Sequence, residues 1–361
     1  MTFMNEKKIL FLISSLKATG PNFVVATLAN GFVKKGYVVT ILSLSVSELE
    51  LTLDEAISVE MMNLSHGKIT HQNVVDYQKK EKKIGPKIVS SHGLRADVLN
   101  SLSKKMDPQV FRIATSHNNP FKDYLSKSFG LKGLPMVIME FLAFTKMNVV
   151  VTLNPFLKSL HSIFLGKKKV VMIPNGVKKL QTEMNSRDIV DFGMVGNIDD
   201  NKNQEQLLRQ ATFFPDSNFV FWGVGPKRGV LMNKFPLSNV SFPGFSKNKE
   251  LVYSSFSVFV SLSKSEGSPL AVLEAISAGK SLILSDIPAH RYIANQLPDA
   301  GFKLVKNEED LKKAIETFRN DEIIKRNMNI MIKAYNEHFS DEVMVDRYYR
   351  LITENVGGKS L

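Results

Sequence analysis

One stretch of the chain, residues 256–287, constrains the fold more than any other. It opens with an apolar run of β-branched and aromatic residues over 256–263, which predicts a buried strand. Residues 268–278 then have the pattern of a helix, and residues 281–285 that of a second short buried strand. A β-loop-α-β unit of this kind is the building block of a parallel sheet.

The ends of the predicted helix are marked by residues with known preferences. Ser268 is expected at the N-cap, Pro269 at the first helical position and Gly279 just after the last turn. Ligands of open parallel sheets bind outside the carboxyl ends of the strands, which is where residues 264–267 are expected. Free N–H groups at the start of the helix favour an anion there.

Two carboxylates flank this expected anion site. Glu266 lies in the loop before the helix, and Glu274 lies within its first two turns. Taken alone, such a pair is more often a solvated loop residue and an ordinary surface residue of a helix. Because the strand, proline and glycine signals agree, we interpret both as ligand-binding residues that hold hydroxyl groups on either side of a diphosphate.

The same residues resemble a family signature. The Glu-x7-Glu motif of retaining GT-B glycosyltransferases, of the family 4-like bacterial surface-glycan type, is similar to the segment Glu266-Gly267-Ser268-Pro269, Glu274-Ala275 and Gly279. The resemblance covers nearly the whole chain and is strongest over residues 190–293. It implies an α/β fold of two Rossmann-like doubly wound domains facing a central cleft, with a C-terminal helix crossing back.

The resemblance also implies roles for individual residues. Glu266 would hold donor-sugar hydroxyls, Glu274 the ribose hydroxyls and Lys202 the diphosphate, and His117 would line the reacting centre. The main chain of Gly267, Ser268, Pro269 and Leu270 would contact the sugar and the diphosphate, through the N–H groups of the three residues other than proline. We predict His117, Glu266 and Lys202 as the catalytic residues.

The phosphate-binding residues depart from the family pattern at one position. In the family, an arginine usually follows the glycine that precedes the phosphate-binding lysine in the sequence, whereas here Asn197 follows Gly196. Lys264, Arg228 and Lys247 are candidates to replace its charge, and Lys264 is included in the predicted donor site. No Asp-x-Asp triplet occurs in the chain, so we predict neither a metal site nor a cofactor apart from the nucleotide-sugar co-substrate.

Further donor-side and acceptor-side positions follow from turns and strand ends. Gly223 and Gly244 are assigned to the nucleotide side by resemblance, whereas Phe242 and Phe245 by themselves favour a place in the core. In the N-terminal half, Gly20 is expected in the loop 15–22, where a tight turn and a close approach to the acceptor are equally compatible with it.

Two histidines are expected at strand ends. His92 and His117 each follow a predicted strand, over residues 87–91 and 110–116, so both are able to face the same ligand. We favour a functional role for His117, and for His92 a structural role and a place on the acceptor side remain equally open.

Strand and helix patterns alternate along both halves of the chain. The expected domains are residues 1–178, completed by the helix 341–361, and residues 188–340, with residues 178–187 as the linker. Residues 121–146 are expected to form one helix packed on the first domain. We also propose that its lysines contact anionic lipid headgroups.

Composition narrows the classes of function. The 361-residue chain has a net charge of +12 and no cysteine, which excludes a disulfide framework and a thiolate metal site. Its basic excess is diffuse, so nucleic acid is not an expected partner. The apolar run 9–13 is expected to be a core strand, and residues 134–144 are too short to span a bilayer. A cytoplasmic protein, peripheral on the inner face of the plasma membrane at most, is expected.

With the family resemblance, which implies retention of configuration and no separate metal, the sequence predicts a hexosyltransferase. It would move a sugar from a nucleotide-diphosphate sugar to a glycan or lipid-linked acceptor in bacterial surface polysaccharide synthesis. Two alternatives are a non-catalytic sugar-nucleotide-binding or glycan-binding subunit, favoured by Asn197, and a GT-B nucleotide-sugar epimerase. A periplasmic-type binding protein is disfavoured because no signal peptide is evident at the start of the sequence.

Overall fold

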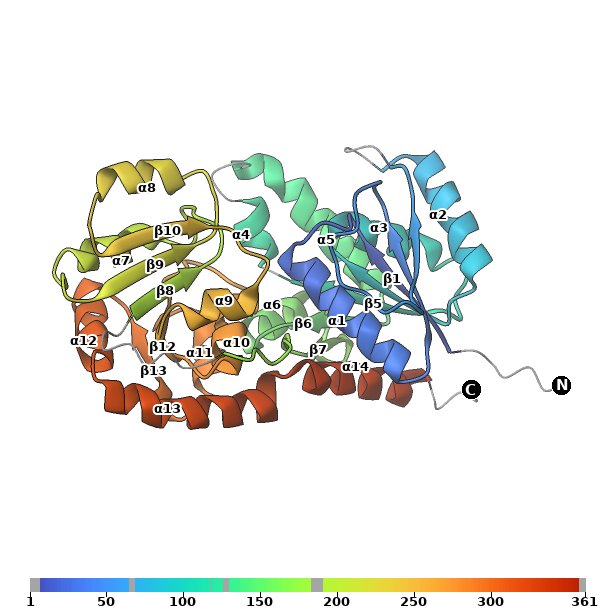
Figure 1. Ribbon diagram of the computed structural model, residues 1–361. Coiled ribbons are helices and arrows are strands. Elements are labelled where there is room, and N and C mark those ends of the chain that lie inside the picture. Colours follow the sequence, from blue (N-terminus) through green and yellow to red (C-terminus); the bar gives the residue numbers. More distant parts are fainter. Residues whose placement is uncertain (1–6, 65–68, 118, 126–129, 183–190, 357–361) are drawn as a thin grey trace. The chain divides into compact units, whose positions relative to one another are not determined.

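The computed structural model describes residues 7–64, 69–117, 119–125, 130–182 and 191–356. Contacts divide the chain into two compact units, Met1–Asn175 with Met344–Leu361, and Gly176–Val343. Each unit holds one sheet whose strands all run parallel (Figure 1). The predicted fold class, with two Rossmann-like domains, is therefore confirmed.

The first unit is built on a seven-stranded sheet in the order β3-β2-β1-β4-β5-β6-β7. Its strands are β1 Lys8–Ile13, β2 Val38–Ser43, β3 Ser58–Met61, β4 Ile88–His92, β5 Phe111–Ser116, β6 Val149–Thr152 and β7 Val170–Met172. Neighbouring residues of β1 face opposite sides, since Leu10 and Leu12 join a core cluster with α2 and α3 while the ring of Phe11 meets Phe32 of α1. The near-continuous apolar strands follow from this burial on both faces.

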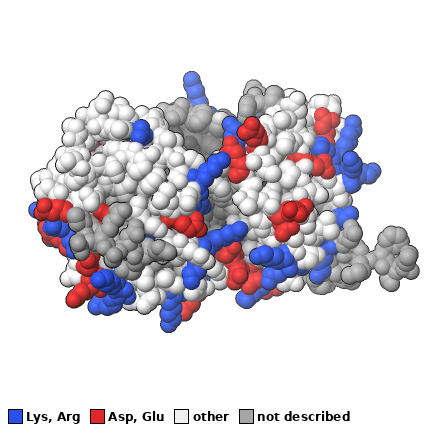
Figure 2. Space-filling view, in the orientation of Figure 1, with Lys and Arg blue, Asp and Glu red and all other residues white. Residues whose placement is uncertain are grey.

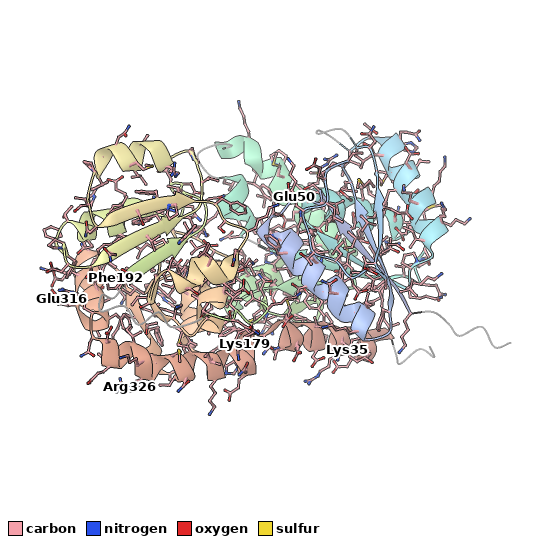
Figure 3. The ribbon with its side chains drawn as sticks, in the orientation of Figure 1. Lys35, Glu50, Lys179, Phe192, Glu316 and Arg326 are labelled. Atoms are coloured by element: carbon pink, nitrogen blue, oxygen red, sulfur yellow. The ribbon has the colours of Figure 1, made fainter. Side chains whose placement is uncertain are left out.

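The helices of the first unit include the C-terminal one. They are α1 Gly20–Lys34, α2 His71–Ile84, α3 Leu94–Ser103, α4 Pro120–Tyr124, α5 Leu134–Lys146, α6 Pro155–Leu165 and α14 Asp341–Val356. In α14, the Tyr348 hydroxyl lies 3.0 Å from Thr115 Oγ1 of β5. Asp346 pairs at 2.6 Å with Lys35, which is labelled at the end of α1 in Figure 3. The chain therefore returns to its first unit after completing the second.

The second unit has a six-stranded sheet in the order β10-β9-β8-β11-β12-β13. Its strands are β8 Asp191–Val195, β9 Asn218–Trp222, β10 Val240–Gly244, β11 Val258–Ser261, β12 Ser281–Ser285 and β13 Phe302–Val305. Its helices are α7 Gln204–Ala211, α8 Arg228–Lys234, α9 Lys249–Ser254, α10 Leu270–Ser277, α11 Pro288–Ala294, α12 Glu308–Phe318 and α13 Asp321–Ala334.

Two core clusters cover the two faces of this second sheet. Val258 and Val260 of β11, with Phe192 of β8 (labelled in Figure 3), face a cluster that includes α7 and α12. Phe259 faces a second cluster, formed with α9, α10 and α13. The buried residues of α12 recur at helical spacing, and Asn307 caps the helix by accepting the Asp310 N–H.

Several predicted elements differ from the structure. The single helix expected over 121–146 is wrong: α4 and α5 are separate, with a 3₁₀ turn at Gly130–Gly133 between them. Helix α6 was not predicted, although Asn154 followed by Pro155 is a typical helix start and the Asn154 side chain accepts the Leu157 N–H.

The segment between the units lies partly outside the described residues, since 183–190 are not described. Val177, which was expected in the first domain, bridges to Ser340 and accepts a hydrogen bond from the Tyr335 hydroxyl at 2.9 Å. Among the described residues, no helix combines the length and apolar character needed to cross a membrane. On the face shown in Figure 2, acidic and basic side chains are interspersed.

Candidate functional site

The strand order of the second unit reverses between β8 and β11, and this is the point where open parallel sheets bind their ligands. The loops that leave these two strands are tied together. The Lys264 N–H donates to the Asn201 carbonyl at 2.9 Å, and the Asn201 side-chain amide donates to the Ser265 carbonyl at 3.1 Å. Residues from both loops are thereby held side by side at the carboxyl edge of the sheet.

Lys202 and Glu266 meet across this point. Lys202 Nζ lies 2.6 Å from Glu266 Oε1, and the two side chains are 24% and 14% exposed. The Lys202 N–H donates to Asp199 Oδ1 at 2.9 Å, which fixes the turn that presents the lysine. The structure therefore brings together the two residues predicted to bind the diphosphate and the sugar, but as an ion pair that the sequence did not predict.

Helix α10 follows Glu266 and begins later than expected. Its first residue is Leu270 and its N-cap is Pro269, so the assignment of Ser268 to the N-cap and Pro269 to the first turn is wrong. The side chain of this N-cap proline makes no capping hydrogen bond. A proline at the cap is tolerated because the N–H that it lacks has no partner within the helix at this position. Gly279 does follow the helix end, with a φ of 70° that favours glycine.

Glu274 lies in the second turn of α10, and its carboxylate is held from two sides. Its Oε1 forms an ion pair with Lys249 at the start of α9, and its Oε2 accepts a hydrogen bond from the Tyr253 hydroxyl at 2.9 Å. Burial, and then the neighbouring carboxylate, raise the pKa of Tyr253 well above its usual value, so the phenol remains a donor. The carboxylate is fixed in place and is not a solvated surface group.

Three predicted glycines lie at the ends of neighbouring strands. The Gly196 N–H donates to the Trp222 carbonyl at 3.0 Å, and the Gly223 N–H donates to the Gly244 carbonyl at 2.7 Å. A Cβ on Gly223 would lie 2.0 Å from the Gly196 carbonyl oxygen, so only glycine fits. Asn197, in the position of the usual arginine, is exposed.

The candidate replacements for that arginine lie in different places. Lys264 lines an open hollow of about 360 Å³ together with Asp200 and Lys227. Arg228 donates to the Phe242 carbonyl at 2.7 Å, and Lys247 is exposed in the loop after β10. None of these positions is among the ion-pair partners of Glu266 or Glu274 that the described residues show.

The two phenylalanines near Gly244 differ from the expectation that both are core residues. Phe242 packs against the core and its ring stacks on Phe221 with centroids 5.1 Å apart. Phe245 is 65% exposed, so its assignment to the core is wrong. The chain turns outward at Gly244, whose φ is 95°, and this turn carries Phe245 away from the sheet.

In the first unit, the two strand-end histidines contact each other. His92 Nδ1 and His117 Nε2 are 2.9 Å apart, and Ser90 Oγ lies 3.1 Å from His92 Nε2. Burial lowers the pKa of His117 to about 4 and, together with His117, that of His92 well below its usual value. Both imidazoles are therefore neutral at neutral pH.

Gly20 is not in a loop as predicted. It is the exposed first residue of α1, whose N-cap is Thr19. Pro21 follows it in the first turn, and proline is favoured at that point of a helix. The strand order of this sheet reverses between β1 and β4, and His92 ends β4. The histidine pair and the start of α1 therefore both lie on the carboxyl-edge side of the sheet.

Comparisons with known proteins agree with this geometry. The family described as "Glycosyl transferases group 1" matches residues 183–337, and "Glycosyltransferase Family 4" matches residues 18–179. The O-antigen biosynthesis glycosyltransferase WclY of Escherichia coli is 26% identical over 80% of this chain and 83% of its own length. The chain is a GT-B glycosyltransferase.

One further relative and one solved structure resemble this glycosyltransferase in different ways. The alpha-galactosylglucosyldiacylglycerol synthase of Streptococcus pneumoniae is 25% identical over 59% of this chain, and the match spans 63% of the synthase. The structure of Anabaena Alr3699/HepE in complex with UDP and glucose has a TM-score of 0.78, with 14% identity over 97% of this chain and all of that one. This structural likeness shows the fold alone.

Some residues of the glycosyltransferase site were missed in the sequence. Lys249 and Tyr253 are four residues apart on α9 and both reach Glu274, and this i, i+4 spacing was the available signal. His290 of α11 is buried, with Nδ1 2.9 Å from the Ser285 carbonyl and Nε2 3.3 Å from Ser261 Oγ. No local pattern indicated His290, because its neighbours come from β11 and β12.

Proposed function

We propose that this glycosyltransferase moves a hexose from a nucleoside-diphosphate sugar to a glycan or lipid-linked acceptor in bacterial surface polysaccharide synthesis, with the anomeric configuration retained. The observation that carries the proposal is the Lys202–Glu266 pair at the switch point of the second sheet, next to the start of α10. The names of the O-antigen and diacylglycerol-lipid relatives support the acceptor class.

In this proposal each residue of the site has one task. Lys202 neutralises the departing diphosphate, so that no separate metal is required. Glu266 accepts hydrogen bonds from the sugar hydroxyls, and Glu274 accepts them from the ribose hydroxyls. Lys249 and Tyr253 hold the Glu274 carboxylate in position. The main chain of residues 267–270 and the strand-end positions Gly196, Asn197, Gly223 and Gly244 contact the rest of the donor.

The histidine pair has a supporting role in the same proposal. His117 contacts the donor sugar or the acceptor, and His92 holds its ring through the 2.9 Å hydrogen bond. A neutral imidazole can both donate and accept a hydrogen bond, which suits contacts with sugar hydroxyls. Gly20, at the start of α1, is assigned to the acceptor side.

Thermal unfolding with a panel of nucleotide sugars tests the donor assignment. At a hundredfold excess over its Kd, a true donor is expected to raise the Tm of the second unit by about 5 °C or more. Release of the nucleoside diphosphate by the purified protein then shows turnover. A panel that leaves the Tm unchanged would contradict the proposal.

A non-catalytic sugar-nucleotide-binding subunit is the second candidate, because exposed Asn197 replaces the usual arginine. A raised Tm with no turnover of the same nucleotide sugar, with or without glycan acceptors, would favour it. Conversion of one nucleotide sugar into another, in the absence of an acceptor, would instead favour an epimerase.

We also propose that α5 and α6 rest on an anionic membrane, on the cytoplasmic side. The two helices are joined by Phe141 and Phe164, whose ring centroids are 4.7 Å apart. The exposed apolar residues of this surface are Leu134, Ile138, Met139, Leu142, Phe156, Ile163 and Phe164. The exposed lysines on and next to these helices are Lys132, Lys146, Lys158, Lys167 and Lys168. Apolar surface edged by cations is typical of interfacial helices.

Vesicle sedimentation tests this surface. Leu142, 61% exposed, is replaced by serine together with Ile138, and binding to vesicles of phosphatidylcholine and phosphatidylglycerol is expected to fall about tenfold. Phe213→Ser, at a similarly exposed position of the second unit, is the control and should bind like the wild type. Equal binding of the wild type to neutral and anionic vesicles would disprove the electrostatic part.

A further inference from the structure

The Lys202–Glu266 pair occupies the position at which a diphosphate is proposed to bind. The ammonium and the carboxylate are 2.6 Å apart, and each side chain is more than three-quarters buried. A partly buried pair of this kind is screened less by salt than a surface pair. In the protein without ligand, the cation proposed for the diphosphate is therefore already neutralised by a carboxylate of the same site.

In the described part of the chain, Lys202 is the cation whose ion pair with Glu266 the structure shows. Lys249, a further lysine of the site, pairs with Glu274. His290 is close enough to interact electrostatically with both residues, but burial lowers its pKa to about 4, so its ring is neutral. Glu266 therefore depends on Lys202, or on a ligand, for its compensation.

We propose that Glu266 makes the site discriminate between the intact nucleotide sugar and the spent nucleoside diphosphate, by competing with the diphosphate for Lys202. This inference rests on the proposed function and deepens it. When the sugar is present, its hydroxyl groups donate to Glu266, and Lys202 can turn to the diphosphate without leaving the carboxylate unpaired. After transfer the sugar is gone, so the carboxylate reclaims Lys202 and repels the diphosphate.

Loss of the Glu266 charge should therefore strengthen binding of the nucleoside diphosphate product, although Glu266 belongs to the proposed donor site. In Glu266→Gln, Lys202 keeps an amide neighbour but loses its counter-ion and is available to the diphosphate. The shape of the side chain is almost unchanged, so the comparison isolates the charge.

Calorimetric titration tests the proposal, with whichever of UDP, GDP and ADP raises the Tm of the wild type most. The Kd of that nucleotide for Glu266→Gln is expected to be about tenfold lower than for the wild type. Glu205→Gln is the matched control, because it removes a carboxylate that pairs with Lys234 and Arg209 elsewhere in the same unit. Its Kd should change less than twofold, which excludes a general effect of net charge.

A double-mutant cycle identifies Lys202 as the group released. In the Lys202→Gln background, adding Glu266→Gln should give less than a third of the tightening seen in the wild-type background. Glu266→Ala replaces Glu266→Gln if the latter does not fold. An unchanged or higher Kd for the single variant, or tightening that persists without Lys202, would overturn the inference while leaving the proposed function intact. If the wild type binds none of the three nucleotides, both fail together.

Discussion

Lys202→Met is expected to lower turnover of the nucleotide sugar by about a hundredfold to a thousandfold, because it removes the cation proposed to stabilise the departing diphosphate. Its ammonium lies at the switch point of the second sheet, 2.6 Å from Glu266. Methionine keeps most of the length of the side chain and removes the ammonium, with its charge and its three N–H donors. Steady-state release of the nucleoside diphosphate, with the donor found by thermal unfolding, measures the effect.

Two further variants make this result specific. Glu266→Ala should also abolish turnover, since it removes the proposed hydrogen-bond acceptor for the sugar hydroxyls. Lys227→Met is the control: this lysine pairs with Asp200 at 3.1 Å in the neighbouring hollow and should keep at least a third of the wild-type rate. Wild-type rates in both Lys202→Met and Glu266→Ala, with the Tm retained, would disprove the assignment of these residues.

Glu81→Gln is expected to destabilise the first unit by about 3 kcal/mol or more, because it leaves a buried guanidinium without its counter-ion. Arg112 is fully buried, and its Nη2 lies 2.5 Å from Glu81 Oε1. The remaining contacts of Arg112, to the Asn100 side chain at 2.8 Å and the Ser103 carbonyl at 3.2 Å, are with neutral groups. They cannot neutralise the charge.

A neighbouring ion pair, between Glu60 of β3 and Lys80 of α2, provides the control. Glu60 and Lys80 are 2.7 Å apart but about a third exposed, so Glu60→Gln should cost less than about 1 kcal/mol. Urea unfolding followed by circular dichroism reports on both units, whereas the only tryptophan, Trp222, lies in the second. The Glu81→Gln effect should appear in the dichroism transition of the first unit. Equal losses of unfolding free energy in Glu81→Gln and Glu60→Gln would contradict the stabilising role of the buried ion pair.

The site shows where reasoning from sequence succeeds and where it stops. The β-loop-α-β pattern around Glu266 and Glu274 correctly predicted a strand, a loop and a helix, because burial and helix-end signals are encoded in adjacent residues. The exact start of α10 was wrong, since Ser268 and Pro269 both suit the region before a helix and only backbone geometry distinguishes them. The sequence around Phe245 likewise did not distinguish a core position from the exposed one that this side chain has.

The sequence by itself determined the fold class, the alternation of strands and helices, and the position of the glutamate motif after a buried strand. Those features depend on hydrophobic periodicity and on residues within about ten positions of each other. Only the tertiary structure decided that Lys202 pairs with Glu266, 64 residues later, that Lys249 and Tyr253 hold Glu274, and that His92 contacts His117. The pairing of two charges depends on how strands are ordered in a sheet, and strand order is set by packing of the whole unit.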